Sequence, residues 1–300
     1  MKSNAAATRP SSFPFWTAGA VVALAVNLRA PLTTVGPLVP DLQRELGLSY
    51  AAAGALTTIP LMAFALLAPA AAALARRFGM KRTLFFSLIV LLVGELLRPL
   101  SGSSWLFAGT VLIGAAIAVD NVLMPALVKE SFPERVGFMM GIYTVTMNMS
   151  AAFASGIAVP LADGWGLGWQ GAFRFWALLA ALALAVWLPQ ARRWEPDGAP
   201  SGSRRSTLWR SWLAWQVTLF MGLQSFFFYC VVTWLPELGQ SKGLAPGAAG
   251  WLLFFFQFAQ LPMMFVSPML AERMDNQKAL IGSAVLCMGA GTLAFFGGQG

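Results

Sequence analysis

The sequence predicts an all-α membrane protein, and its composition, its long apolar runs and the placement of its basic residues all support this fold class. Of the 300 residues, 58% are hydrophobic and only 11% are charged, and the mean hydropathy is +0.68. Soluble domains carry about 25% charged residues, and a water-soluble chain this apolar would expose large hydrophobic patches. We therefore expect a lipid bilayer to be the solvent for most of the chain.

Nine apolar runs are long enough to cross a bilayer, because a spanning helix needs roughly 17–25 mostly apolar residues. Inside hydrocarbon no water is available to the backbone, so each run is expected to be helical. The nine expected spans are 15–35, 51–75, 83–100, 105–127, 137–160, 171–188, 212–235, 247–270 and 279–296.

Lys and Arg residues are unevenly distributed over the connections between these runs. With a cytoplasmic N-terminus, the inner segments hold all of the twenty basic residues except Arg29, Arg44, Arg98, Arg174 and Lys242. Cytoplasmic loops carry such an excess, which predicts a multi-pass protein of the bacterial inner (cytoplasmic) membrane with its N-terminus inside. The same distribution explains the net charge of +8 without a nucleic-acid partner.

The residues needed for metal or nucleophilic chemistry are missing from this sequence. It contains no histidine, and its two cysteines, Cys230 and Cys287, lie in apolar runs. A zinc or haem ligand set and a histidine-dependent nucleophile are therefore excluded. We expect no metal, no cofactor and no enzymatic activity.

A polar segment at 190–210 divides the apolar runs into two groups. It is rich in Pro, Gly, Ser and Arg, and apolar periodicity stops there. RRFGMKR follows the second run and ERMDNQK follows the eighth, which indicates a parallel repeat. We predict an N-terminal six-helix half at 1–189, a cytoplasmic linker at 190–210 and the first three helices of a C-terminal half at 211–300. The repeat implies three more helices, so we interpret the chain as a fragment.

Arg29 places a permanent positive charge inside the first run, about 6 Å beyond its centre. A charge at such a depth costs about 2.5–3.5 kcal/mol on insertion scales. The side chain either reaches an interface or a neighbouring helix, or it faces a wet cavity and binds an anionic or strongly dipolar solute. Asn27 and Thr33 are candidate hydrogen-bonding neighbours, and Pro31 is expected to bend or break the helix.

The predicted third and fourth spans also hold charged residues. Asp120, in the fourth, is either a structural partner or the acceptor of a coupling proton, and its depth argues against direct pairing with Arg29. Glu95 and Arg98 are three residues apart in the third, on one helix face, and are expected to form an ion pair.

Amides occur near the centres of the fifth and seventh runs. Asn148 shares a helix face with Thr144, and Gln224 lies a short distance before Tyr229. Buried amides are costly in lipid, so these side chains are expected to face protein or water. The spacing of Gly137 and Gly141 is typical of close helix approach.

Three segments resemble a known transporter family. They are NLRAPLTTVGPLVPDLQ, LMPALVKESFPERVGFMMGIY and FFFYCVVTWLPELGQSKGLAPGAAG. The chain resembles the cyanate/2-nitroimidazole transporter branch of the major facilitator superfamily along nearly its whole length. The resemblance implies a major facilitator-type helical bundle of twelve transmembrane helices in two six-helix halves, a 6+6 pseudo-repeat of which nine are expected here. It also places Arg29, Asp120 and Gln224 on helices that line a central cavity.

By this resemblance, the function is secondary active transport of a small polar or anionic solute, cyanate-like or nitroimidazole-like, by alternating access. Arg29 would anchor the solute, and Asp120 would be a proton or counter-charge site. The residues that would orient the solute are Asn27, Asn148, Gln224 and Tyr229. The inner-loop gating residues would be Arg76, Arg77, Lys81 and Arg82. Arg76 departs from the superfamily, which usually has an acidic residue there.

The expected partners are a small-molecule solute, a coupling proton and the lipid bilayer, and the protein is expected to be a monomer. The alternative functions are a membrane-embedded enzyme, which would need paired acids or a metal motif near an interface, and a non-transporting sensor or scaffold.

Overall fold

The computed structural model describes residues 15–192 and 211–264, together with short helical pieces at 282–283, 285–287 and 289–291. Its contacts group residues 1–257 into one compact unit and 258–300 into a second. Within the described ranges the chain is helical and contains no strand. The all-α prediction is therefore confirmed, and the description below concerns the first unit.

Six helical stretches in the described residues are long and apolar enough to cross a membrane. They are Phe15–Thr33, Tyr50–Phe78, Ser103–Ser131, Val136–Gly164, Gly168–Pro189 and Trp215–Ser241. The predicted third span is the 18-residue helix α5 (Met80–Leu97), which carries three charged residues. The predicted eighth span begins as α10 (Pro246–Phe258), and most of the ninth lies outside the described residues, as does the predicted linker beyond residue 192.

The first predicted span is broken into α1 (Phe15–Asn27), α2 (Ala30–Thr33) and α3 (Val35–Leu46). Pro31 has no backbone N–H to give to the carbonyl of Asn27, and its ring opposes a regular helix there. The expected break at Pro31 is thus confirmed. The predicted end near residue 35 agrees with the span Phe15–Thr33. Beyond it a separate helix, α3, runs on to Leu46 and ends at Gly47, whose φ of +64° suits a helix C-terminus.

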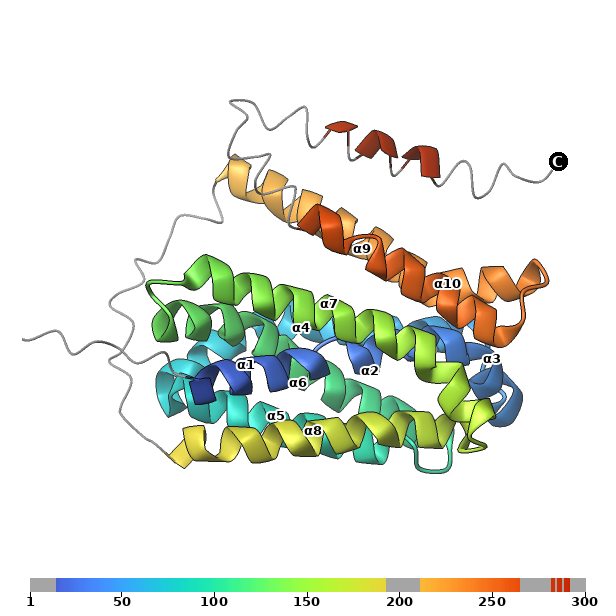
Figure 1. The fold of residues 1–300 in the computed structure, drawn as a ribbon, viewed down its shortest axis with the longest axis horizontal. Coiled ribbons are helices and arrows are strands. Elements are labelled where there is room, and N and C mark those ends of the chain that lie inside the picture. The colour runs from blue at the N-terminus through green and yellow to red at the C-terminus, as the bar shows by residue number, and fades with distance from the viewer. Residues whose placement is uncertain (1–14, 193–210, 265–281, 284, 288, 292–300) are drawn as a thin grey trace, which may run out of the picture. The chain divides into compact units, whose positions relative to one another are not determined.

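The helices of the N-terminal half pack into one bundle (Figure 1). Helix α6 (Ser103–Ser131) lies against both α4 (Tyr50–Phe78) and α5, while α8 (Gly168–Arg192) lies against α5 and α1. Helix α7 (Val136–Val159) packs on α1 and α2 and continues into a π-helical turn, Pro160–Gly164. The largest apolar core cluster is built from α1, α5, α6, α7 and α8.

Two glycines allow α5 and α6 to touch through their backbones. A Cβ on Gly109 would lie 2.6 Å from the Gly94 carbonyl oxygen, and a Cβ on Gly94 would lie 2.9 Å from the Gly109 carbonyl oxygen. By contrast, a Cβ on Gly137 or Gly141 would meet no described atom within 4 Å. The close approach expected at that pair is therefore not seen, because it depends on which helix face a neighbour covers.

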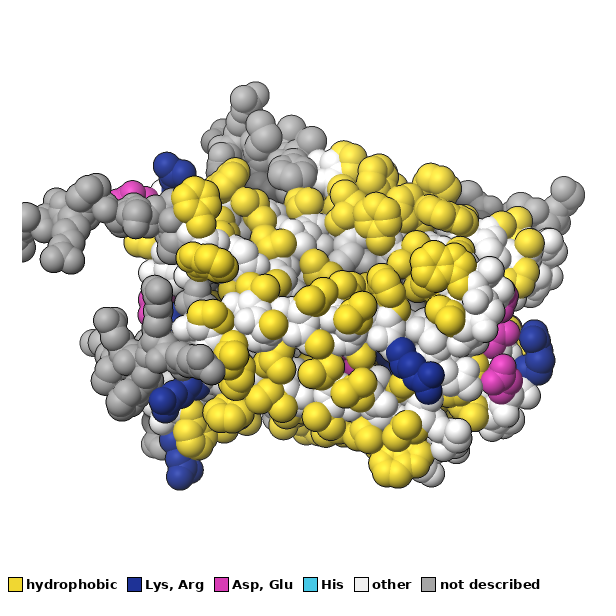
Figure 2. All heavy atoms as spheres, turned by 60° about the horizontal axis from the view of Figure 1, so that its bottom comes forward, with side chains coloured by type: hydrophobic (Ala, Val, Ile, Leu, Met, Phe, Trp, Pro, Cys, Tyr) yellow, Lys and Arg dark blue, Asp and Glu magenta, His cyan; other side chains and the backbone are white. Residues whose placement is uncertain are grey.

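Hydrophobic side chains cover much of the face that Figure 2 shows, and most Lys and Arg side chains in that view lie toward its two ends. Large apolar side chains are exposed along the spanning helices, among them Leu66, Phe86, Leu178 and Leu182. A soluble monomer rarely exposes apolar surface on this scale, whereas a bilayer covers it without cost. The surface is that of a multi-pass membrane protein.

Candidate functional site

Arg29 lies at the break between α1 and α2, where it is the residue before the first turn of α2. Its φ of −122° and ψ of −29° are not those of a regular helix. Its half-buried side chain donates from Nη1 to Oδ1 of Asn148 on α7, at 3.3 Å. Its guanidinium carbon lies 5.0 Å from the ring centroid of Phe228 on α9 (Trp212–Ser241). One arginine therefore contacts both α7 and α9.

The positive charge of Arg29 has no carboxylate partner among the described residues, since its contacts are a neutral amide and an aromatic ring. Arg44 provides the contrast, because its Nη1 lies 3.4 Å from Oδ1 of Asp41. A guanidinium presents planar donors that match a carboxylate-like acceptor and it never deprotonates. An unneutralised guanidinium inside a spanning segment is a position that can accept an anion or a strong dipole.

Asn148 is held so that its oxygen faces Arg29. Its Nδ2 donates to the Thr144 carbonyl one turn earlier, at 2.7 Å, which leaves Oδ1 for the guanidinium. Thr33, the other expected neighbour, is buried and donates to the Ala151 carbonyl of α7 at 3.0 Å. The bond from Thr33 fixes α2 against α7. It thereby determines which side of α7 Arg29 contacts.

Two tyrosines lie in the neighbourhood of Arg29. Tyr229 packs edge-on against Phe228, with ring centroids 5.3 Å apart. Tyr143 of α7 is almost fully buried and also lies near Asp120. Sequence reasoning did not assign Tyr143 to the site. The available signal was a tyrosine well inside a predicted span, away from both membrane interfaces.

Two of the expected solute-binding residues do not join this group. Asn27 is buried and donates from Nδ2 to the carbonyls of Ala23 and Leu179, so it faces α8. Asn27 is the last residue of α1 and Arg29 precedes α2, so the two side chains lie on either side of the helix break and make different contacts. Gln224 lies one turn before Phe228 on α9 and is exposed.

Asp120 is fully buried on α6 and accepts a hydrogen bond from the Ser87 hydroxyl of α5 at Oδ1. Its other carboxylate oxygen has no protein partner in the described part of the chain. Asp120 is therefore not paired with Arg29, as its depth within the predicted fourth span indicates. A buried carboxyl with one unused oxygen retains room for a proton.

The expected ion pair between Glu95 and Arg98 is not formed. Neither carboxylate oxygen of Glu95 has a hydrogen-bond partner in the described residues. Arg98 instead donates from Nη1 to the Pro31 carbonyl at 2.7 Å and stacks over Phe173, 4.3 Å from the ring centroid. A buried carbonyl and a ring face contact this guanidinium in place of the neighbouring carboxylate, while its Nε and Nη2 have no hydrogen-bond partner among the described residues. Arg98 thereby ties the C-terminal end of α5 to the broken segment that carries Arg29.

The four basic residues assigned to gating surround the turn between α4 and α5. Arg76 and Arg77 are in the last turn of α4, and Lys81 and Arg82 are in the first turn of α5. Gly79 connects the two helices with a φ of +84°, a conformation that side chains rarely adopt. The carbonyl of Lys81 accepts a bond from Nε1 of Trp187 at 3.0 Å, which fixes the start of α5 to α8.

The sequence matches a known protein family over most of its length. Residues 15–300 match the description of the Major Facilitator Superfamily. The chain belongs to the major facilitator superfamily.

Several transporters are similar to this superfamily member. Uncharacterized transporter YycB of Bacillus subtilis is 44% identical, with 90% of this chain and 67% of YycB covered. The 2-nitroimidazole transporter of Escherichia coli is 38% identical over 91% of this chain and 70% of its own length. The cyanate transport protein CynX of Escherichia coli is 27% identical over 89% and 69%. These relatives confirm the resemblance to the cyanate/2-nitroimidazole branch, and the chain spans about two thirds of each.

A solved structure supports the superfamily fold. The inward-facing, unoccupied crystal structure of a bacterial homologue of the human lysosomal transporter Spinster gives a TM-score of 0.68 at 17% identity. The match covers 88% of this chain and 64% of that one. At this identity the likeness concerns the fold alone, which is the helical bundle that positions Arg29.

Proposed function

We propose that this superfamily member is a secondary active transporter that moves a small polar or anionic solute across the inner membrane by alternating access. The observation that carries the proposal is the unneutralised Arg29 guanidinium at a helix break inside a spanning segment. A charge in that position is expensive unless water or a solute reaches it. The names of the relatives, which transport 2-nitroimidazole and cyanate, favour a cyanate-like or nitroimidazole-like solute.

The contacts of Arg29 support a solute site shared by two groups of helices. Asn148 approaches the guanidinium from α7 and Phe228 from α9, on the other side of the predicted linker. A solute bound at Arg29 would touch both groups, so its binding energy would depend on how they are arranged. That dependence is what alternating access requires, with the site open to one side at a time. Tyr229 would orient the solute from α9, and the basic α4–α5 turn would act in gating.

Counterflow is the direct test of this function. The full-length gene product is reconstituted in vesicles loaded with unlabelled solute, and entry of trace labelled solute is followed for cyanate, other small anions, nitro-heterocycles and neutral sugars. A carrier gives a transient accumulation of label above equilibrium, because bound solute crosses in exchange. We expect this overshoot for at least one anion or nitro-heterocycle and for no neutral sugar. Entry without overshoot would indicate a channel and would contradict alternating access.

We further propose that Asp120 carries the coupling proton. The unused oxygen of its buried carboxyl supports this role, and Tyr143 lies near both Asp120 and Arg29. The Asp120→Asn variant can still accept the Ser87 hydrogen bond but cannot release a proton. We expect it to lose uptake driven by a pH gradient, by about tenfold or more, while counterflow persists. Ser87→Ala is the matched control, because it keeps the carboxyl, and unchanged driven uptake in Asp120→Asn would refute the assignment.

A further inference from the structure

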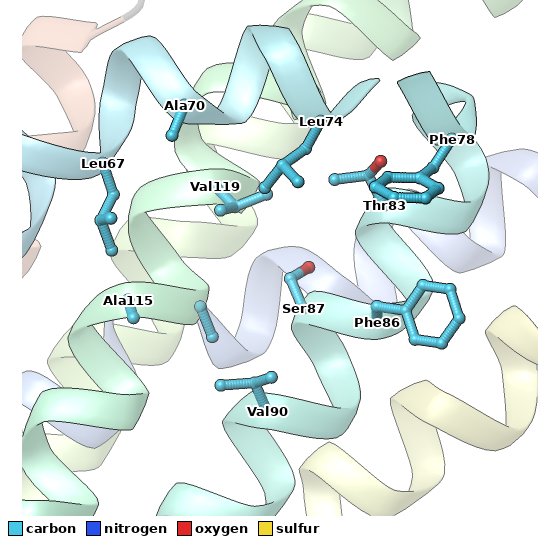
Figure 3. Close-up of a pocket in the computed structure, with 11 residues that line it drawn as sticks. Leu67, Ala70, Leu74, Phe78, Thr83, Phe86, Ser87, Val90, Ala115 and Val119 are labelled. Atoms are coloured by element: carbon cyan, nitrogen blue, oxygen red, sulfur yellow. The ribbon is translucent and has the colours of Figure 1, made fainter. Parts of the chain in front are cut away.

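A groove of ≈ 460 Å³ opens between α4, α5 and α6 (Figure 3). Arg29 is not among the residues that line it. Side chains from all three helices line it. The residues that line it, hereafter the groove residues, are Leu67, Ala70, Leu74, Phe78, Thr83, Phe86, Ser87, Val90, Ala115, Ala116 and Val119.

The lining offers hydrocarbon and almost no hydrogen-bonding capacity. Nine of the eleven groove residues are apolar. The two hydroxyls are already engaged, since Thr83 donates to the Gly79 carbonyl at 2.8 Å and Ser87 donates to Asp120. A polar solute would lose its hydrogen bonds to water in this groove without gaining others, whereas an acyl chain has no hydrogen bonds to lose.

The length of the groove matches one leaflet of a bilayer. On α4 it extends from Leu67 to Phe78, which is roughly 16 Å at the helical rise per residue. The hydrocarbon core of a bilayer is about 30 Å thick, so one leaflet spans about 15 Å. The groove therefore runs from the α4–α5 turn to about the middle of the membrane, the depth of a single acyl chain.

One end of the groove is strongly basic. Phe78 and Thr83 line that end. The segment RRFGMKR, residues 76–82, contains Phe78 and ends directly before Thr83, and it contributes four positive charges and no carboxylate. This basic turn is defined as Arg76, Arg77, Lys81 and Arg82. Arg76 and Arg77 are exposed and form no ion pair with any described residue, and Arg77 lies over the Phe78 ring at 5.3 Å. A concentration of one sign of charge at a membrane interface selects lipids of the opposite sign.

We propose that the groove and the basic turn together bind one anionic glycerophospholipid. Its acyl chain lies along the groove residues, and its phosphate lies at the basic turn. The headgroup is anionic rather than zwitterionic because the turn has no carboxylate to pair with a choline or ethanolamine. The site is separate from Arg29 and does not depend on which solute the protein carries.

Photocrosslinking tests this site directly. The full-length gene product is placed in nanodiscs with a trace of phosphatidylglycerol, or of phosphatidylcholine, that carries a diazirine on one acyl chain. After irradiation, labelled peptides are mapped by mass spectrometry. We expect phosphatidylglycerol to label the groove residues several-fold more than phosphatidylcholine does, and unlabelled phosphatidylglycerol to compete.

Two variants separate the contributions of headgroup and chain. The first variant carries Arg76→Gln, Arg77→Gln, Lys81→Gln and Arg82→Gln, and it should reduce phosphatidylglycerol labelling to the phosphatidylcholine level. The second, Ala70→Phe, fills the groove and should reduce labelling by both lipids. Lys129→Gln, at the end of α6, is the matched control for loss of charge and should change neither. All variants are first checked for a monodisperse elution profile.

The proposal fails if the two lipids label the groove equally, if the charge variant labels as the unaltered protein does, or if no lipid adduct maps to the groove residues. The last result would mean that another part of the protein occupies the groove. Because labelling is measured without solute, it is independent of the transport assays.

Discussion

Replacing Arg29 with alanine is expected to abolish transport while leaving membrane insertion intact. Removing one partner of a buried charged interaction costs about 2–5 kcal/mol, so uptake should fall roughly 30-fold or more. Insertion should not suffer, because the variant makes the first spanning segment more apolar. The measurement is initial uptake or counterflow by the reconstituted variant, normalised to the amount of inserted protein.

A graded series makes this prediction specific to the guanidinium. Arg29→Lys keeps the charge but loses the planar pair of donors, and we expect it to be impaired as well. Asn148→Ala removes the hydrogen-bond partner that the Arg29 side chain has among the described residues, and it should weaken solute affinity less than Arg29→Ala does. Arg44→Gln is the matched arginine control, since Arg44 is exposed and paired with Asp41. Unchanged uptake kinetics in Arg29→Ala would defeat the assignment of the solute site.

Gly109→Leu is expected to disrupt the bundle itself. A Cβ at this position would lie 2.6 Å from the Gly94 carbonyl oxygen and 2.8 Å from the Arg98 backbone nitrogen. Both contacts are backbone atoms, so no side chain can turn aside to make room. Overpacking of a core costs about 1–3 kcal/mol and sometimes more, which corresponds to a melting temperature lower by about 5 °C or more. Thermal unfolding of the purified variant in detergent measures the effect.

Gly141→Ala is the matched control for this substitution. Gly141 is also inside a spanning helix, and a Cβ there would meet no described atom within 4 Å. We expect its melting temperature to be unchanged or slightly higher, because alanine favours helix over glycine. If Gly109→Leu melted like Gly141→Ala, the close approach of α5 and α6 would be wrong. The disruption should also reduce transport, because α5 carries the Arg98 that bonds to the Pro31 carbonyl.

Much of the fold follows from the sequence because the bilayer imposes it. A long apolar run in hydrocarbon has no alternative to the helix, so the runs near α4, α6, α7, α8 and α9 could be located without coordinates. The break at Pro31 is equally local, since it results from a missing N–H and a ring clash within one turn. Arg29 could be singled out for the same reason, because a charge inside such a run is costly whatever surrounds it.

The partners of these side chains depend on how each helix is rotated and what packs against it, which only the tertiary structure decides. Asn27 and Arg29 are two residues apart, yet one faces α8 and the other meets α7 and α9. Glu95 and Arg98 share a helix face, yet Arg98 bonds to Pro31, far away in the chain. Hydrophobicity and spacing determine that a segment spans the membrane. Rotation about its axis is set by contacts between distant helices, such as that of Gly94 with Gly109.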